Sequence, residues 1–442
     1  MASSNDTPSV PVDVITEGVR MARFGALSAL RIGKTMGVLY PKAAYWLFQW
    51  RKPRPEEVRE TFEKLGVTYI KLGQLIASSP SIFPKEYVEA FQGCLDQTSP
   101  ISFDEVLDVM RSDLGRPLDE IFSDIQPEPL ASASIAQVHA ATLVSGEDVV
   151  VKVQKPGVQG VLTVDMNFLF VLSRLLELVS PGLSHESISG MVSELYQSML
   201  DECDFVKEAD NLDAFNEFLQ RSGIQEVIAP RPYRQASSMR VLTMERFYGV
   251  PLTDYDNLGQ YTDDPAMVLI TGLNTWFASL MQCDFFHADL HSGNIMLLQD
   301  GRLGFIDFGL VGHIKPEIWK AMFALMDGIS HNDYAAIAES MVAVGMTSEA
   351  VDTDALTRDI ASLIEKAADL DPEAGLDFNP DINQDINHLL IELSELGKSY
   401  GIRFPRSFTL LLKQFLYFDR YVQMLVPEMD IFNDARIDML LP

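Results

Sequence analysis

The sequence predicts an α+β fold in which a small sheet-containing lobe precedes a larger helical lobe, with a helical extension in front of both. Two strand-like runs, 135–143 and 148–153, are joined by the turn Ser-Gly-Glu-Asp, as in a hairpin. Residues before about 110 and after about 252 instead have apolar positions at helical spacing. With 442 residues, 47% of them apolar, the chain can bury more than one core.

Residues 1–12 are expected to form a disordered tail and residues 13–110 the helical extension. Within the extension, apolar periodicity is clearest over 65–76 and 85–94. Proline ends or interrupts helices, so we expect breaks at Pro41, Pro53, Pro80 and Pro84.

The small lobe is assigned to residues 111–248 and the large lobe to residues 249–442. Besides the hairpin, the small lobe is expected to contain one long helix over roughly 187–220 and a strand within 239–249. The large lobe is expected to be helical apart from short strands near 295–298 and 302–306. Its last apolar stretch, 408–425, is interpreted as core packing rather than a lipid site.

Composition limits the function classes. A net charge of −29 argues against nucleic acid as a partner, because phosphate binding needs a basic surface. The chain lacks an apolar run of about 18 residues, so no transmembrane helix is predicted, and no targeting peptide is evident. The widely spaced Cys94, Cys203 and Cys283 favour a reducing compartment, and we expect a cytoplasmic protein.

One stretch departs from this acidic character. Between Glu17 and Glu56 there is no acidic residue, but there are eight basic ones: Arg20, Arg23, Arg31, Lys34, Lys42, Arg51, Lys52 and Arg54. The aromatic run "YWLFQW" lies in the same stretch. Basic and aromatic residues on a helix suit an anionic membrane surface, but a helix docked on the protein's own acidic body would have the same composition. Both interpretations stay open.

The motifs "HADLHSGN" (287–294) and "DFG" (307–309) predict phosphoryl-transfer chemistry. At this spacing Asp289 accepts or orients a proton, while Asn294 and Asp307 offer magnesium the oxygen ligands it prefers. The alternative is a zinc site on His287 and His291, but the segment has the character of a loop and no third ligand is evident nearby. We expect His287 to bond locally and assign no role to His291.

Such chemistry requires a lysine on a strand of the small lobe, and "DVVVKV" provides Lys152. A solvent-facing lysine would be the plainer interpretation, but the downstream motifs disfavour it. Its acidic partner should come from "LDECDFVKEADN", which offers Glu202, Asp204 and Glu208. On a continuous helix Glu202 lies about 240° from Glu208, so these two glutamates require different cations. The spacing does not say which lysine meets which glutamate.

The segment that would cover the phosphates, Pro129 to His139, contains no glycine, which taken alone counts against a kinase. However, "KLGQ" (71–74), "LASASIAQVH" (130–139), "ECDFVKEADN" (202–211) and the two motifs above together resemble the UbiB/AarF family of atypical protein-kinase-like proteins. In that family an alanine-rich loop replaces the glycine-rich one. The resemblance implies a bilobal kinase-like fold with ATP and Mg²⁺ as cofactors.

The resemblance also implies roles for individual residues. Lys152 would contact phosphate and pair with Glu208, while Lys71 and Gln74 of the extension would lie over the site, with Lys71 paired to Glu202 of the Glu-x-Asp motif that ends at Asp204. Asp289 would be the catalytic aspartate, and Asn294 and Asp307 the metal ligands. The nucleotide would be contacted by Ala131, Ser132, Ala133 and Ser134 of the loop and by Glu245 and Phe247 of a hinge.

In function, the resemblance implies an ATPase or small-molecule phosphotransferase that supports ubiquinone or related isoprenoid-quinone biosynthesis. Its partners would be an isoprenoid lipid or the inner face of a membrane, and quinone-biosynthesis proteins. Ser132 and the catalytic-loop sequence depart from the family's usual pattern, and no Ala-Pro-Glu-like segment follows Asp307, which argues against a protein substrate. Two alternatives are a phosphotransferase of the aminoglycoside or choline kinase type, and a non-catalytic scaffold switched by nucleotide.

Overall fold

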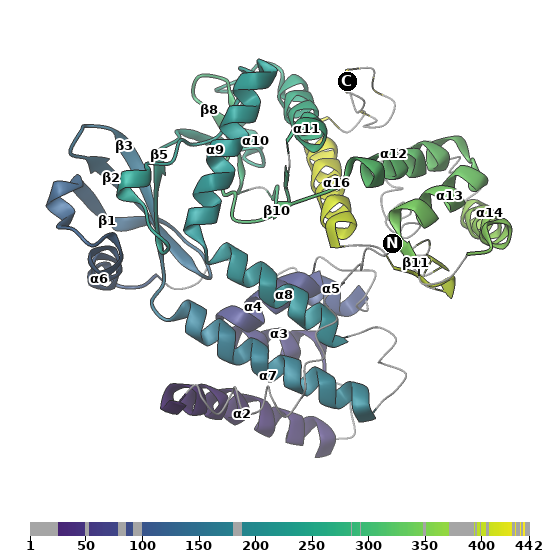
Figure 1. Ribbon diagram of the computed structural model, residues 1–442, viewed down its shortest axis with the longest axis horizontal. Coiled ribbons are helices and arrows are strands. Elements are labelled where there is room, and N and C mark those ends of the chain that lie inside the picture. Colours follow the sequence, from purple (N-terminus) through teal and green to yellow (C-terminus); the bar gives the residue numbers. More distant parts are fainter. Residues whose placement is uncertain are drawn as a thin grey trace, which may run out of the picture.

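The structure is a computed structural model. It describes residues 25–48, 53–77, 85–91, 100–179, 188–283, 285–291, 293–347, 351–370, 399–403 and 406–426, with single residues between 393 and 437. The expected tail, Pro80, Pro84, Cys94 and four of the eight basic residues (Arg20, Arg23, Arg51 and Lys52) lie outside these residues. The chain folds as predicted into an α+β structure with a small sheet region and many helices (Figure 1).

The small lobe is an antiparallel sheet in the order β1-β2-β3-β5. Its strands are β1 (Phe122–Ser132), β2 (Ala136–Leu143), β3 (Asp148–Gln154) and β5 (Val241–Glu245). Helix α6 (Phe103–Leu114) packs along its length against one face of this sheet, where Val106, Val109 and Met110 are buried. The expected boundary at residue 110 therefore falls within a helix that belongs to the sheet.

Strand β1 was not predicted, because it contains Pro127 and Pro129 and is mostly exposed. Its position explains this composition. The strand pairs only with β2, and its register shifts between Ile125 and Pro129. An edge strand with a bulge tolerates prolines, since their missing N–H groups face no partner strand.

A layer of helices lies beside the sheet (Figure 1). It consists of α2 (Gly25–Phe48), α3 (Pro55–Leu65), α4 (Val67–Ala77), α5 (Lys85–Phe91), α7 (Val158–Val179) and α8 (Ile188–Glu202). The prediction of a break at Pro41 is wrong, because α2 runs through it. Both Pro41 and Gly37, one turn earlier, are exposed, so water can bond the Gly37 carbonyl that the proline leaves free. Helix α7 was not anticipated.

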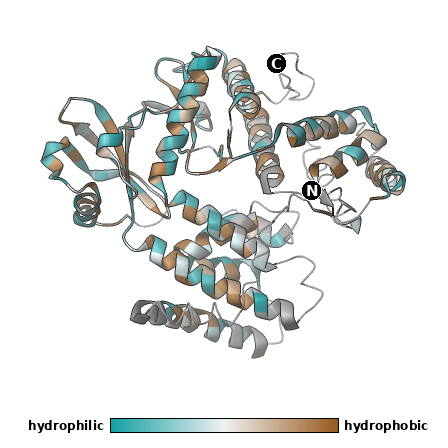
Figure 2. Cartoon of the chain, viewed as in Figure 1, coloured by the Kyte–Doolittle hydropathy of each residue, from teal (hydrophilic) through white to brown (hydrophobic). Residues whose placement is uncertain are grey.

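The single helix expected over 187–220 is in fact two, α8 and α9 (Phe205–Ser222). Asp204 separates them and caps α9, accepting hydrogen bonds from the backbone N–H groups of Val206 and Lys207. Glu202 and Glu208 thus lie on different helices, and the rotation calculated for a continuous helix does not apply to them. Figure 2 shows apolar and polar residues mixed around α7, α8 and α9, as expected for helices buried on one side.

The large lobe surrounds a second sheet, in the order β4-β9-β8-β6. Its strands are β4 (Val227–Ile228), β6 (Gly249–Pro251), β8 (Ile295–Leu298) and β9 (Leu303–Phe305), and β7 (Phe286–His287) pairs separately with β10 (Val311–Gly312). Its helices are α10 (Tyr255–Leu258), α11 (Pro265–Gln282), α12 (Pro316–His331), α13 (Tyr334–Val344), α14 (Thr353–Leu370) and α16 (Arg406–Leu425), and β11 (Met346–Thr347) pairs with β12 (Ile402–Arg403).

Helix α16 packs in the core, as interpreted from its sequence: Leu411, Phe418 and Tyr421 are buried, and Phe418 contacts Trp276 of α11. Among the helices that the structure describes, none has the length and apolar character needed to cross a bilayer.

Helix α2 is docked on the protein's own body. Arg31 bonds to the carboxylate of Asp165 on α7, with its Nε 2.9 Å from Oδ1, and donates to the Leu65 carbonyl oxygen at 2.7 Å. The Thr68 hydroxyl of α4 donates to the same carboxylate at 2.8 Å. Asp165 is only 2% exposed, so this network joins α2, α3, α4 and α7 around one buried charge.

Candidate nucleotide and metal site

Lys152 lies on the face of the small sheet that is turned away from α6. Along the sheet it pairs with Val138 of β2 and Leu242 of β5, and Val138 pairs in turn with Ala131 of β1. Directly paired residues of antiparallel strands point to the same side, so these four side chains share one face. Lys152 is 8% exposed, which excludes the interpretation of a solvent-facing lysine.

Two carboxylates hold the Lys152 ammonium. Its Nζ lies 2.8 Å from Glu208 Oε1 and 3.0 Å from Glu208 Oε2. It also lies 3.0 Å from Asp307 Oδ2. The structure thus brings a strand of the small lobe, the first turn of α9 and the Asp-Phe-Gly segment of the large lobe to one point. The Asp307 side chain is 44% exposed and so faces the open side of this group.

The charges in this group are strongly coupled. Burial disfavours the charged form of Lys152, but the two carboxylates outweigh it and raise the pKa of the ammonium above its ordinary value. Burial also raises the pKa of Glu208, to about 7, despite the attraction of Lys152. For Asp307 burial acts in the same sense, but the charge and hydrogen bond of Lys152 prevail and hold its pKa below the ordinary value. Asp307 is therefore the anionic group that remains accessible.

The backbone at the Asp-Phe-Gly segment is unusual. Asp307 has φ of 60°, in the left-handed region that non-glycine residues seldom adopt and that clusters at functional sites. A side-chain carbon on Gly309 would lie 3.1 Å from Asp307 Oδ1, so glycine leaves room for this carboxylate. Asn211 of α9 donates to the carbonyl oxygen of Phe308 at 2.9 Å and ties the segment to the helix that carries Glu208.

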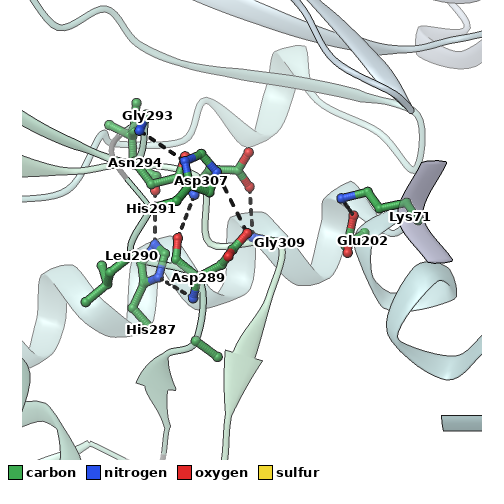
Figure 3. A network of polar contacts seen from close by, with 12 residues as sticks. Lys71, Glu202, His287, Asp289, Leu290, His291, Gly293, Asn294, Asp307 and Gly309 are labelled. Carbon is green, nitrogen blue, oxygen red and sulfur yellow. Dashed lines mark hydrogen bonds and ion pairs between the residues drawn. The ribbon is translucent and has the colours of Figure 1, made fainter. Parts of the chain in front are cut away.

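His287 has both ring nitrogens occupied by the backbone. Nδ1 accepts from the Asp289 N–H at 3.2 Å, and Nε2 lies 3.1 Å from the Ile306 carbonyl oxygen (Figure 3). Burial lowers the pKa of His287, so it is a neutral local brace, as predicted. Within the described part of the chain no three His, Cys, Asp or Glu side chains gather as a metal site would require. The zinc alternative therefore has no geometric support.

Asn294 and Asp307 fit magnesium by the chemistry of their donors. The Asn294 amide nitrogen donates to the Asp289 carbonyl oxygen at 2.8 Å, which orients the side chain. None of the described residues bonds to its Oδ1 oxygen. An amide oxygen and an anionic carboxylate are the hard ligands that Mg²⁺ takes. Asp289 itself is 26% exposed, with Oδ2 3.8 Å from His291 Nε2.

Lys71 of the extension pairs with Glu202 at the end of α8, with Nζ 2.8 Å from Oε2. Both side chains are 18% exposed, and Figure 3 shows the pair to one side of the loop 287–294, here called the catalytic loop. Gln74 lies one turn further along α4 and is half-buried. Asp204, the last residue of the Glu-x-Asp motif, caps α9.

The alanine-rich segment forms the tight end of the β1–β2 hairpin, where the Ala133 N–H donates to the Ala136 carbonyl oxygen at 2.9 Å. Ala131 shares the face of Lys152. Ser132 pairs with Gln137, whose amide bonds to Ile101, so its side chain lies on the opposite, α6-facing side. The Ser134 hydroxyl is buried without a partner among the described residues.

The expected hinge follows β5. Glu245 is exposed at the end of the strand, and its N–H donates to the Arg231 carbonyl oxygen at 2.9 Å. The half-buried Phe247 ring packs over Gly304 of the large lobe, where a side-chain carbon would lie 3.0 Å from it. Sequence reasoning missed Asn211 and the residues of α11 and α16 that bond to the catalytic loop. No local pattern in the sequence relates these residues to that loop.

Residues 93–341 match the ABC1 atypical kinase-like domain. A chloroplastic protein of Arabidopsis thaliana, described as an uncharacterized aarF domain-containing protein kinase, is 44% identical over 87% of this chain and 74% of its own length. A probable protein kinase UbiB of Azotobacter vinelandii is 28% identical over 89% of this chain and 74% of its own.

Among solved structures, the erythromycin complex of a Mycobacterium tuberculosis protein is similar, with a TM-score of 0.53 and 24% identity. The match covers 89% of this chain and 98% of that one. At this identity the likeness shows the shared fold.

Proposed function

Because the chain belongs to the family of ABC1 atypical kinase-like proteins, which includes UbiB, we propose that it binds ATP with magnesium and hydrolyses ATP or transfers its terminal phosphoryl group. The observation that carries the proposal is the convergence of Lys152, Glu208 and Asp307, with contacts of 2.8 and 3.0 Å. This set joins a phosphate-binding cation to the accessible carboxylate that a metal requires.

We assign some of these residues to binding of magnesium-ATP and one, Asp289, to proton transfer. Glu208 holds Lys152 toward the site, while Asp307 and Asn294 are the proposed metal ligands. Bound magnesium would neutralise phosphate charge as it builds up. Asp289 is the proposed base, since the carbonyl and N–H groups around it are all bonded and its carboxylate is partly exposed.

Binding of magnesium-ATP to Asp307→Asn tests the metal role. We expect its affinity to be at least about tenfold below that of the wild type, since a neutral amide replaces an anionic ligand. Asp300→Asn is the matched control: Asp300 lies in the exposed turn after β8 and pairs only locally with Arg302. Equal affinity of wild type and Asp307→Asn would remove Asp307 from the site.

Turnover distinguishes an enzyme from a nucleotide-switched scaffold. We expect Asp289→Asn to bind magnesium-ATP as the wild type does but to lose hydrolysis, measured with and without anionic liposomes. If the wild type binds without turnover under both conditions, ATP hydrolysis is refuted and the scaffold is supported.

We further propose that the outer face of α2 contacts an anionic membrane. Arg31 is not available for this contact, because it is committed to Asp165. The outer face nevertheless exposes Met36 (42%), Tyr40 (69%) and Phe48 (88%), which share one side of the helix, with Lys34 also exposed nearby. Aromatic and basic side chains on one helix face suit the headgroup layer of a bilayer.

Point variants test this contact better than removal of α2, which would strip Asp165 of Arg31. Tyr40→Glu with Phe48→Glu is expected to reduce co-sedimentation with anionic liposomes, while Val144→Glu, at a 56% exposed position of the β2–β3 turn, should leave it unchanged. Undiminished pelleting of the double variant would refute the contact.

The likeness to UbiB supports a role in isoprenoid-quinone biosynthesis. Quinone content of cells that lack the protein, supplied with wild type or Asp289→Asn, tests that role. Equal quinone content with and without the wild type would refute it.

A further inference from the structure

The backbone around Asp289 is held from outside the catalytic loop. Trp276 Nε1 on α11 donates to the His287 carbonyl oxygen at 3.1 Å. The Ala288 N–H donates to the carbonyl oxygen of Leu310, which follows the Asp-Phe-Gly segment, at 3.1 Å. Inside the loop, the Asn294 amide donates to the carbonyl oxygen of Asp289. Three polar groups next to Asp289 are left to be satisfied: the Ala288 carbonyl and both backbone groups of Leu290.

Helix α16 satisfies all three. The Gln414 amide accepts from the Leu290 N–H, with Oε1 2.8 Å from the nitrogen, and donates from Nε2 to the Ala288 carbonyl oxygen at 2.7 Å. The Tyr421 hydroxyl donates to the Leu290 carbonyl oxygen at 2.7 Å. Gln414 therefore bonds to the residue before and the residue after Asp289, and Tyr421 adds a third contact two turns along the same helix.

Because these groups are buried, the loss of any of these hydrogen bonds would be costly. Gln414, Ala288 and Leu290 are all 0% exposed, and Tyr421 is 2% exposed. Water cannot replace either partner at such depth, so a lost bond leaves a buried backbone group unsatisfied. An amide is also suited to the task, since it carries a donor and an acceptor on one rigid plane. A glutamine on the buried side of a helix is unfavourable unless both its donor and its acceptor are used.

We propose that Gln414 and Tyr421 are positioning residues for Asp289, so that α16 fixes the orientation of the catalytic carboxylate. The proposal rests on the proposed phosphoryl-transfer function. Neither residue faces Lys152, Glu208 or Asp307 through any described contact, so their effect falls on the chemical step and not on nucleotide binding.

Kinetics of Gln414→Met test the proposal, since methionine keeps the length and burial but removes both bonds. We expect kcat to fall about a hundredfold, the loss that a displacement of roughly 1 Å causes, with KM for ATP nearly unchanged. Gln414→Glu keeps the acceptor for Leu290 N–H but sets a carboxylate against the Ala288 carbonyl, so it should not restore kcat. Tyr421→Phe removes one bond and should lower kcat about tenfold.

Leu411→Ala is the matched control for lost stability. Leu411 is fully buried on the same helix and makes no described hydrogen bond to the loop through its side chain. Assayed well below its thermal midpoint, this variant should keep kcat although its midpoint falls. Equal loss of kcat in Leu411→Ala and Gln414→Met would overturn the positioning role.

Hydrogen exchange at the Leu290 amide keeps the test independent of turnover. Without nucleotide, Gln414→Met should exchange this amide about ten to a hundred times faster than the wild type, while Leu411→Ala should not at matched stability. If Gln414→Met leaves the exchange rate of the Leu290 amide unchanged, the positioning role of Gln414 is refuted, even if the protein turns over no ATP. Failure of the wild type to bind magnesium-ATP, with the exchange difference present, refutes the proposed function alone.

Discussion

Lys152→Met is expected to destabilise the protein by an amount that grows with pH. Lys152 is the cation beside Glu208, which is 1% exposed. Even with this cation present, burial raises the pKa of Glu208 from its ordinary 4.5 to about 7. Between these two values the folded protein keeps a proton that the unfolded chain has released, so the free energy of unfolding falls as pH rises through this window.

The magnitude follows from the proton. Each pH unit over which only the folded state is protonated costs about 1.4 kcal/mol of stability. In the wild type this loss levels off above pH 7, where folded Glu208 also ionises, and amounts to about 1.4 kcal/mol between pH 6 and 8. Without Lys152 the acid stays protonated in the folded state throughout this range, so the variant should lose about 3 kcal/mol.

Thermal and urea unfolding of both proteins at pH 6, 7 and 8 measure this difference. The double variant Lys152→Met with Glu208→Gln is the control, because a neutral amide removes the titrating group and should make the effect of the lysine substitution independent of pH. A stability loss of equal size at pH 6 and pH 8 in Lys152→Met would show that Glu208 is not a buried acid dependent on this lysine.

Three further substitutions test the packing. Burial opposes ionisation of Asp113, but hydrogen bonds from the Ser238 hydroxyl and from Arg240 N and Nε, the last two at 2.9 and 2.8 Å, hold its pKa below the ordinary value. Asp113→Asn should therefore cost about 1–3 kcal/mol in urea unfolding at pH 7, and the wild type should lose the same contribution as pH falls below 3.8. Gly249→Ala places a methyl group against the Leu297 carbonyl oxygen, so its thermal midpoint should fall sharply, by the equivalent of about 3 kcal/mol or more. Asp165→Asn removes the carboxylate that anchors α2, and limited proteolysis should then cut α2 faster than the rest of the chain; an unchanged rate would contradict the anchor.

Sequence periodicity and turn residues predicted the central hairpin well, because the polar turn after Leu143 and the alternation in β3 are local signals. They failed where tertiary structure overrides a local signal. Helix α2 passes through Pro41 on an exposed side, and edge strand β1 contains two prolines. Residues 187–220 were predicted as one helix instead of two because Asp204 is acceptable both inside a helix and as its cap, and only the structure shows which.

The candidate site was found by residue type and spacing, since Asp289, Asn294 and Asp307 stand in a short stretch. Their supports could not be found in this way. Gln414 is one of several polar residues in α16, and nothing local relates it to a loop 124 residues earlier. Likewise, Arg31 lies in a basic and aromatic stretch whose composition suits a membrane surface, and only the structure shows that its side chain bonds to Asp165 instead.

The bond from Gln414 to Leu290 has a consequence for synthesis. At roughly 5–20 residues per second, a ribosome needs about 6–25 s to add the 124 residues that separate the two. Once Asp307 has also been added, the nascent chain has all of the proposed phosphate and metal ligands, but its loop lacks the bonds from α16. If α16 positions Asp289 as proposed, the protein would become competent for turnover only when α16 leaves the exit tunnel, so a chain terminated before α16 would bind nucleotide without turning it over.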